Sequence, residues 1–228
     1  MSYCVRPMQA NDIPGLILID REAFSPQWPP TPFRRELSNS MACYLVAIPD
    51  QDGELSEVAP ESPQPQADRT IRRIVSKVGS LVGVHHPQRN VTSKNVVGYI
   101  AFWMLADEAH ITSIAVRQAY RQQGIGELLL ISAIDLADTK GASVITLEVR
   151  ASNLAAQALY AKYGFARVGE RRAYYLDNRE DAVIMTTDPV ASPSYQSRLH
   201  QLKQAFMHQR QGILAGTLKN RLMESRTS

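Results

Sequence analysis

A six-residue segment, Arg121 to Gly126, has the composition of a phosphate-binding loop. Its sequence is Arg-Gln-Gln-Gly-Ile-Gly, and it lies between a predicted strand at 110–116 and an apolar predicted helix at 127–138. Glycines let backbone amides approach an anion, and the start of a helix adds unpaired amides and the positive end of the helix dipole. The glycine order differs from the dinucleotide fingerprint, and no Gly-Lys-Ser/Thr follows as in a Walker loop. The segment therefore predicts a ligand that carries phosphate.

A carboxylate in the middle of a predicted strand is the candidate general base. Glu148 lies within the apolar strand 144–150, and period-two alternation places it on one face with Thr146 and Arg150. A carboxyl group withdrawn from water can take up a proton near neutral pH, which suits a general base. A structural ion pair with Arg150 or another cation explains the same pattern equally well.

A tyrosine on the following predicted helix is the candidate acid. Asn153 is the predicted N-cap of the helix that ends at Tyr163, and Gln157 and Tyr160 lie four and seven positions later on the same face. This face can turn toward Glu148 across a short loop. A phenol with a reference pKa of ~10 can protonate a departing thiolate. A helical tyrosine that only packs against its neighbours is the alternative.

These residues are carried by elements whose order indicates a mixed α/β sheet. The predicted strands are 3–6, 41–48, 96–105, 110–116, 144–150, 166–175 and 182–186, and the predicted helices are one ending near Phe24, a short one at 32–37, 127–138 and 153–163. The third and fourth strands are predicted to form a hairpin. Strands, helix, strand, helix and strands in this order are typical of a sheet flanked by helices.

Residues 1–188 are predicted to form one catalytic domain with two additions. The segment 49–95 is first acidic and then basic, with many Gly, Pro, Gln and Ser residues in its first half, which indicates a partly disordered insertion. Residues 189–228 carry six basic side chains against the single acid Glu224, and we expect a basic, helical C-terminal extension. A solvated basic helix is the ordinary interpretation of such an extension, and direct contact with RNA is the weaker one.

The composition also indicates where the protein is expected to be located and which partners it is expected to lack. The chain has two cysteines and no apolar secretory segment at its start, so a reducing, cytoplasmic location is expected. No apolar run reaches the roughly eighteen residues of a membrane span, and no membrane partner is expected. The pair His85-His86 has no third ligand at metal spacing, so no metal site is expected.

Taken together, the segments resemble the GNAT acetyltransferase family. The matching segments are Ile114-Ala115-Val116, Arg121 to Gly126, Leu147 to Asn153, Ala158-Leu159-Tyr160 and Tyr163-Gly164-Phe165. Within that family, 148–153, 171–175 and 179–185 resemble the bacterial ribosomal-protein-alanine N-acetyltransferases. The similarity is strong over 96–187 and weaker over 3–48. It implies a GNAT fold: a central mixed, mostly antiparallel twisted β-sheet flanked by helices, here with an inserted segment and a C-terminal helical extension.

The resemblance implies acetyl-CoA as the co-substrate and assigns a role to each matching position. The backbone of Ile114 and Val116 would pair with the pantetheine arm, and the amides from Gln122 to Glu127 would hold the pyrophosphate. The implied cofactor-binding residues are Ile114, Ala115, Val116, Arg121, Gln122, Gln123, Gly124, Ile125, Gly126, Glu127 and Asn153. Glu148 would act as the base, through water, and Tyr160 as the acid.

The resemblance also implies an acceptor site lined by aromatic residues. Trp28, Tyr174 and Tyr175 would line the entrance for a peptide, although aromatic side chains in loops also pack on neighbours without any role in binding. The expected acceptor is the N-terminal alanine amine of a small-subunit ribosomal protein, protein eighteen, which attacks the thioester directly. Cys43 has no evident partner for a covalent relay.

Two other functions remain open from the sequence. One is a GNAT acetyltransferase with broader N-terminal, lysine or small-amine acceptors. An α-amine has a pKa of ~7.7 to 8 and a lysine ~10.4, so deprotonating the α-amine costs about 3.5 kcal/mol less at pH 7 and favours the N-terminus. The other is an acyl-CoA-binding, ribosome-associated module without turnover, which would need neither Glu148 nor Tyr160.

Overall fold

The computed structural model describes residues 2–50 and 95–224, with side chains as far as Arg210. The predicted insertion at 49–95 therefore lies almost entirely outside the described residues. The strands are β1 (Tyr3–Pro7), β2 (Ala42–Pro49), β3 (Gly98–Leu105), β4 (Glu108–Val116), β5 (Val144–Arg150), β6 (Phe165–Arg171) and β7 (Ala182–Thr187). The α-helices are α1 (Ile13–Ala23), α2 (Phe33–Glu36), α3 (Ile125–Thr139), α4 (Leu154–Lys162) and α5 (Pro193–Glu224). Two short 3₁₀ helices are η1 (Ala10–Asp12) and η3 (Gln118–Tyr120).

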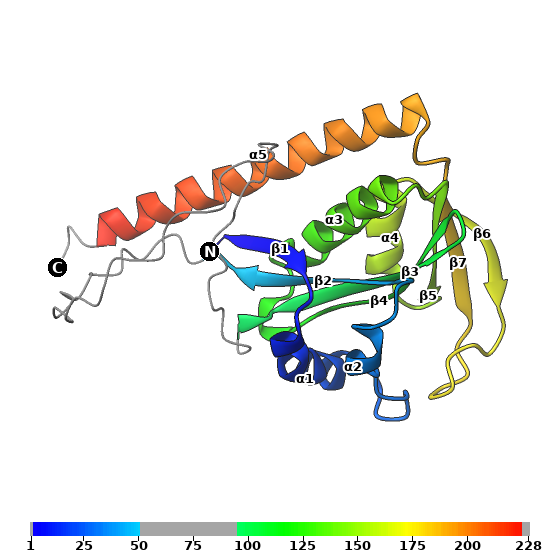
Figure 1. Ribbon diagram of the computed structural model, residues 1–228. Coiled ribbons are helices and arrows are strands. Elements are labelled where there is room, and N and C mark those ends of the chain that lie inside the picture. The colour runs from blue at the N-terminus through cyan, green and yellow to red at the C-terminus, as the bar shows by residue number, and fades with distance from the viewer. Residues whose placement is uncertain (1, 51–94, 225–228) are drawn as a thin grey trace, which may run out of the picture. The chain divides into compact units, whose positions relative to one another are not determined.

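The strands form one open, seven-stranded sheet in the order β1-β2-β3-β4-β5-β7-β6. Every neighbouring pair is antiparallel except β4 and β5, which run parallel. Helices α1 and α2 cover one face, and α3, α4 and α5 lie over the other (Figure 1). The fold is thus the mixed, mostly antiparallel sheet flanked by helices that the sequence predicts.

The main core lies between the sheet and α3. This helix buries apolar side chains all round, because the sheet lies on one side of it and α5 on the other. The fully buried side chains with the largest volumes are Tyr99, Tyr163, Phe102, Leu16, Ile19, Ile100, Ile125, Leu129, Leu130, Ile134, Ile145 and Leu147. Strand β5 and the first turns of α3 are therefore held by tight packing, which fixes the positions of the loops that follow or precede them.

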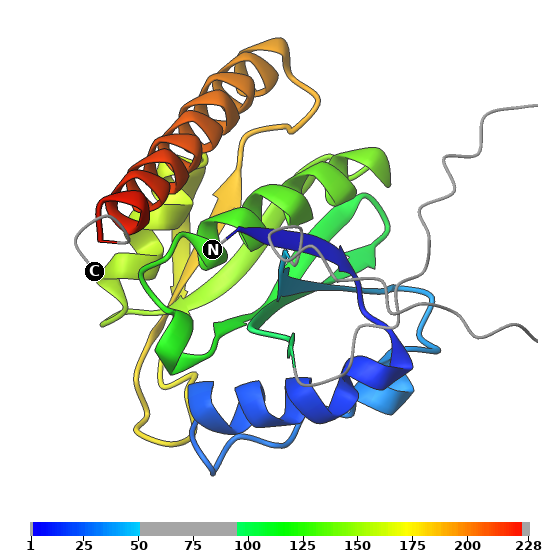
Figure 2. The same ribbon diagram turned by 90° about the vertical axis from the view of Figure 1, so that its left-hand side faces the viewer.

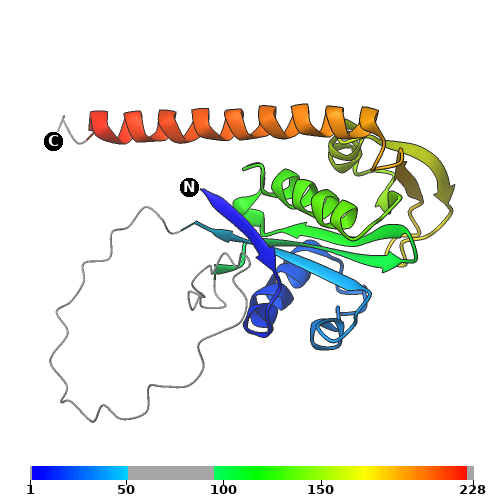
Figure 3. The ribbon, with the colours of Figure 1, turned by 45° about the horizontal axis from the view of Figure 1, so that its top comes forward.

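Helix α5 extends over α3 and α4 and is anchored to them (Figures 2 and 3). Tyr195, Leu199 and Phe206 belong to the buried core. Two basic side chains contact the domain as well: Lys203 forms an ion pair with Asp135 of α3, and Arg198 donates hydrogen bonds to carbonyls at the end of α4. No helix in the described ranges combines the length and the apolar character that a membrane crossing requires.

One predicted strand is shorter than expected. The pattern predicts a strand over 166–175, whereas β6 ends at Arg171. The backbone then turns through Ala173, whose φ is 50°, and its amide donates a hydrogen bond to the Asp181 carboxylate. Tyr174 and Tyr175 therefore lie in the turn between β6 and β7 and not in a strand.

Candidate functional site

The parallel strands β4 and β5 pair along only part of their length. Glu108 to Ile111 of β4 lie opposite Val144 to Leu147 of β5, and the pairing ends there. The ladder between β3 and β4 is irregular at the same place, since Ala101 pairs with Ser113 and Phe102 with Ile111, leaving Thr112 as the extra residue of a bulge. Beyond it, β4 continues beside β3 alone. We call the unpaired ends, 112–116 of β4 and 148–150 of β5, the strand fork.

An extended ligand arm fits the strand fork. Backbone amides and carbonyls of 112–116 that face β5 have no partner strand in the described sheet, and such an edge can pair with an extended chain. Ile114, Ala115 and Val116, to which the resemblance assigns the pantetheine arm, all lie here. The Val116 carbonyl accepts a hydrogen bond from Arg121 Nε at 3.2 Å, which ties the following loop to the fork.

The predicted phosphate loop leads from this strand into α3. Gln122 and Gly124 have φ of 60° and 73°, and Gly124 is the N-cap of α3. The first hydrogen bond of the helix runs from the Leu128 amide to the Gly124 carbonyl, so the amides before Leu128 have no acceptor inside the helix. This geometry is suited to an anion.

The side chain of Glu127 points away from the anion position and onto α4. Its Oε1 accepts hydrogen bonds from Lys162 Nζ at 2.5 Å and the Tyr163 hydroxyl at 2.6 Å. Burial, with this carboxylate beside it, raises the pKa of Tyr163 well above its ordinary value. A carboxylate facing a phosphate would repel it, so this arrangement leaves only the Glu127 amide for an anion.

Glu148 is held between two basic side chains, one from the adjacent strand β4 and one from β6, which lies beyond β7 in the sheet. Its side chain is only 8% exposed, and it lies 3.1 Å from His110 Nε2 and 3.0 Å from Arg171 Nε. His110 comes from β4, and Arg171 is the last residue of β6. The sequence analysis did not identify either of them. The signals in the sequence were a histidine at the start of the predicted strand 110–116 and the place of Arg171 in the matching segment 171–175.

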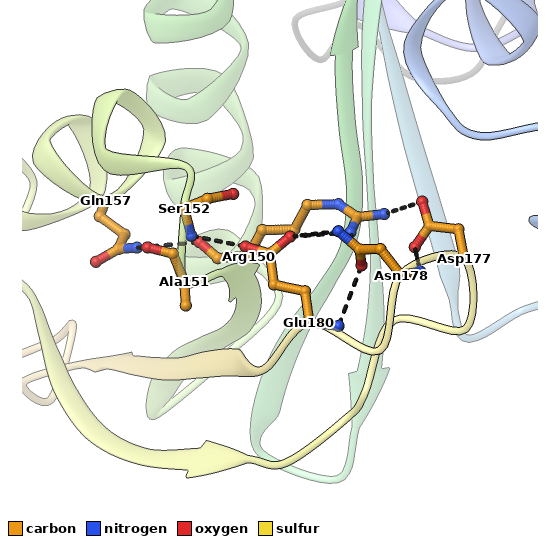
Figure 4. A network of polar contacts seen from close by, with 7 residues as sticks. All are labelled: Arg150, Ala151, Ser152, Gln157, Asp177, Asn178 and Glu180. Atoms are coloured by element: carbon orange, nitrogen blue, oxygen red, sulfur yellow. Dashed lines mark hydrogen bonds and ion pairs between the residues drawn. The ribbon is translucent and has the colours of Figure 1, made fainter.

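The sequence leaves open a structural ion pair of Glu148 with Arg150 or another cation. Arg171 is that other cation, so the ion pair exists, whereas Arg150 has different partners. Its guanidinium donates to Asp177 at 2.8 Å, Asn178 at 3.1 Å and Glu180 at 3.2 Å, all in the turn between β6 and β7 (Figure 4). Arg150 is two positions after Glu148 and therefore lies on the same face of β5, but its guanidinium pairs with the acids of the turn between β6 and β7. Glu148 is left to His110 and Arg171.

Helix α4 begins with the predicted cap. The Asn153 side chain accepts a hydrogen bond from the Ala156 amide at 3.2 Å. Gln157 Nε2 donates to the carbonyls of Arg150 and Ala151 at 3.0 Å each, which fixes the start of α4 to the end of β5 (Figure 4). Both side chains therefore set the angle at which α4 leaves the strand fork.

Tyr160 lies on α4 with its ring packed against Phe165, at 5.8 Å between ring centroids. Burial raises its pKa well above the ordinary value, with a smaller contribution from Tyr175. The hydroxyl therefore keeps its proton at neutral pH, as an acid catalyst must.

The three aromatic residues predicted for the acceptor entrance come together. Trp28, from the loop between α1 and α2, lies 6.2 Å from Tyr175, and Tyr174 lies 5.2 Å from Tyr175, between ring centroids. Arg171 stacks over Tyr174 at 5.7 Å while its Nε contacts Glu148. Arg171 therefore contacts both an entrance residue, Tyr174, and the candidate base, Glu148.

A cavity of about 510 Å³ extends from Trp28 along the sheet to the bulge of β4. It is lined by Phe24, Trp28, Pro29, Pro30, Thr31, Pro32, Arg35, Glu36, Asn39, Tyr44, Trp103, Thr112 and Ser113. Glu36 is buried in its wall and accepts a hydrogen bond from Trp103 Nε1 at 3.0 Å. Apart from Trp28, the sequence analysis assigned none of these residues to a site.

Two other expectations concern cysteine and metal chemistry. Cys43 is buried in β2, and burial raises the pKa of its thiol, which disfavours the thiolate that a relay needs. Within 2–50 and 95–224 no group of three or more His, Cys, Asp or Glu side chains could hold a metal ion, whereas His85-His86 falls outside these ranges.

Comparisons with known proteins agree with this geometry. Residues 15–165 match the model of the acetyltransferase (GNAT) family. A putative ribosomal protein bS18-alanine N-acetyltransferase of Bacillus subtilis (strain 168) is 34% identical over 182 residues, 79% of this chain and 92% of that protein.

Two solved structures have a similar fold. The ribosomal-protein-S18-alanine N-acetyltransferase from Escherichia coli has a TM-score of 0.58 and 25% identity, covering 84% of this chain and 96% of its own. Arabidopsis thaliana NAA60 in complex with acetyl-CoA has a TM-score of 0.56 and 16% identity, covering 81% and 97%. The family match and the Bacillus subtilis relative show that the chain belongs to the GNAT acetyltransferase family and is an acyltransferase.

Proposed function

We propose that this acetyltransferase moves the acetyl group of acetyl-CoA to the N-terminal α-amine of a protein. The acceptor that we favour is the N-terminal alanine of ribosomal protein bS18, because the Bacillus subtilis relative and the Escherichia coli structure both carry that activity in their names. A buried carboxylate between His110 and Arg171, at the base of the strand fork, is the observation that supports this proposal most.

The chain offers suitable groups for acetyl-CoA, which supplies the activated acetyl thioester. The fork exposes backbone groups of 114–116 for an extended arm, and the first turn of α3 presents free amides to a diphosphate. Glu127 is paired with Lys162, so its negative charge is compensated and does not repel the diphosphate. Asn153 contributes by capping α4 beside the fork, which leaves its side-chain nitrogen for a ligand.

Glu148 acts as the base in this proposal. A neutral α-amine is the nucleophile, and Glu148 accepts its proton through a water molecule. Arg171 balances the carboxylate charge, and His110 fixes its orientation from the opposite side. Because an α-amine loses its proton more easily than a lysine side chain does, a carboxylate is a sufficient base.

Tyr160 acts as the acid. Its buried hydroxyl remains protonated and can donate to the thiolate that leaves when the amine attacks the thioester. The transfer needs no covalent enzyme intermediate, since the one buried thiol on β2, Cys43, is held in its unreactive form.

The acceptor enters between Trp28 and the turn that carries Tyr174 and Tyr175. These rings give an extended peptide an apolar contact, and the cavity behind Trp28 has room for a side chain near the N-terminus. The acid Glu36 and the indole of Trp103 supply the polar part of that wall.

The test combines a single substitution with a peptide panel. Glu148→Gln is expected to lower kcat at least 100-fold while the Kd for acetyl-CoA stays unchanged, because only the proton acceptor is lost. Glu170→Gln, at an exposed acid on the edge strand β6, is the matched control and should keep wild-type turnover.

The panel contains a peptide with a free N-terminal alanine, the same peptide with a blocked N-terminus, and the blocked peptide with an added lysine. Thiol release from acetyl-CoA should require the free N-terminal alanine. Faster acetylation of the blocked, lysine-containing peptide would assign the enzyme to lysine acceptors instead, and wild-type turnover by Glu148→Gln would remove Glu148 from its role.

A further inference from the structure

The phosphate loop is held from outside by both ends of the chain. The N-terminal strand β1 reaches it through Tyr3, whose hydroxyl donates a hydrogen bond to Gln123 Oε1 at 2.6 Å. The ring of Tyr3 also packs edge-on against Tyr120 of η3, at 6.5 Å between centroids. Two residues of the stretch from η3 to α3 are thus fixed by one side chain of β1.

Helix α5 contacts the same loop from the other side. Phe206 is 4% exposed, and a methyl group at Gly124 would lie only 3.4 Å from its Cε2 atom. One turn further along α5, the guanidinium of Arg210 lies 5.5 Å from the Phe206 ring and 5.5 Å from the Tyr3 ring. Arg210 therefore joins the two contacts. We call Tyr3, Phe206 and Arg210 the loop clasp.

The loop needs such support because its backbone is unfavourable by itself. Gln122 has a φ of 60°, a left-handed conformation that costs a side-chain-bearing residue free energy, and Gly124 is left-handed as well. A conformation of this kind persists only where the surroundings enforce it. The amides that follow Gly124 are those aimed at the anion position, so the clasp controls how well they are preorganised.

We propose that the loop clasp positions the phosphate loop for the pyrophosphate of acetyl-CoA, with Phe206 and Tyr3 as positioning residues. The inference depends on the proposed use of acetyl-CoA. It gives the C-terminal helix a function in cofactor affinity, although α5 lies outside the family match, which ends at residue 165.

The test compares two acetyl donors that differ in phosphate. Phe206→Ala is expected to raise the KM for acetyl-CoA about tenfold and to leave kcat at saturation and the acceptor KM unchanged. With acetyl-pantetheine, which has no pyrophosphate, the variant and the wild type should have equal kcat/KM. Met207→Ala, at an exposed neighbouring position on α5, is the control and should match the wild type with both donors.

Tyr3→Phe removes one hydroxyl without opening the core and gives an independent measurement. It is expected to weaken the binding of CoA, measured by calorimetry, by about threefold. An unchanged or tighter CoA affinity in both variants overturns the inference, and so does an equal loss of rate with acetyl-CoA and acetyl-pantetheine. If the wild-type protein itself fails to bind CoA, the proposed function fails, a result distinct from wild-type binding that the variants leave unchanged.

Discussion

Arg150 is expected to hold the acceptor entrance in place. It is the last residue of β5, and it connects that strand to Asp177, Asn178 and Glu180 in the turn between β6 and β7 (Figure 4). Its guanidinium also stacks on Tyr175 at 3.9 Å. Arg150→Ala should therefore destabilise the protein and loosen the turn that carries the aromatic residues.

The size of the effect follows from these contacts. The Arg150 side chain is 28% exposed, so solvent screens its hydrogen bonds to the turn, and about 0.5 kcal/mol for each of the three is a reasonable value. The stacking on Tyr175 adds about 0.5 to 1 kcal/mol. The total loss is about 2 kcal/mol, which corresponds to a decrease in Tm of about 4–8 °C for a domain of this size.

Calorimetry and steady-state kinetics measure the two consequences separately. If about 1 kcal/mol of the loss appears as weaker binding of the acceptor, the acceptor KM should rise about fivefold, with the Kd for acetyl-CoA unchanged. Arg150→Lys keeps the charge but loses the planar fork, and an intermediate effect is expected. Arg167→Ala on β6, whose partner Glu170 is also exposed, is the control and should shift Tm by less than 2 °C. A Tm and an acceptor KM that both equal the wild-type values in Arg150→Ala would refute the reasoning.

Two further substitutions test the remaining parts of the site. Tyr160→Phe should lower kcat at least tenfold at an unchanged KM for acetyl-CoA; since burial raises the Tyr160 pKa above 10, the neutral hydroxyl persists below that value, and a wild-type pH–rate profile should show no decrease from its ionisation between pH 8 and 10. Gly126→Val should raise the Kd for CoA at least tenfold by calorimetry. A Cβ there meets only Val116 Cγ2 at 3.9 Å, so the protein accommodates the side chain, which would occupy space that the proposed pyrophosphate needs. An unchanged Kd would contradict this placement. A valine at Gly124 is a poorer test, since its φ of 73° strains any side chain.

The order of the elements and the phosphate loop could be predicted because both depend on local sequence. Apolar periodicity alone separates α3 from the strands around it, although the helix begins at Ile125, two residues before the predicted start. Asn153 is a similar case, since a side-chain cap acts within three residues of its own position.

The end of β6 could not be predicted from local sequence. Tyr174 and Tyr175 are aromatic residues of high strand propensity, so the pattern extends the strand to them. The chain instead turns because Arg150, from a strand that precedes β6 by an entire helix, pairs with acids further along the turn. Tertiary contacts of this kind override propensity.

The position of Glu148 could not be predicted from local sequence, because it depends on where the pairing of β4 and β5 ends. Leu147 is the last residue of β5 that pairs with β4, so Glu148 is the first residue of the strand fork. The paired strands behind it shield it from water, whereas the fork in front of it is open. His110 belongs to the paired part of β4, and its contact with Glu148 bridges the two strands where the backbone ladder stops. A carboxylate one residue earlier would be on the other face of the sheet, and one two residues later would lie beside the turn. The end of the β4–β5 pairing thus places Glu148, and no acid before it on β5, at the start of the fork.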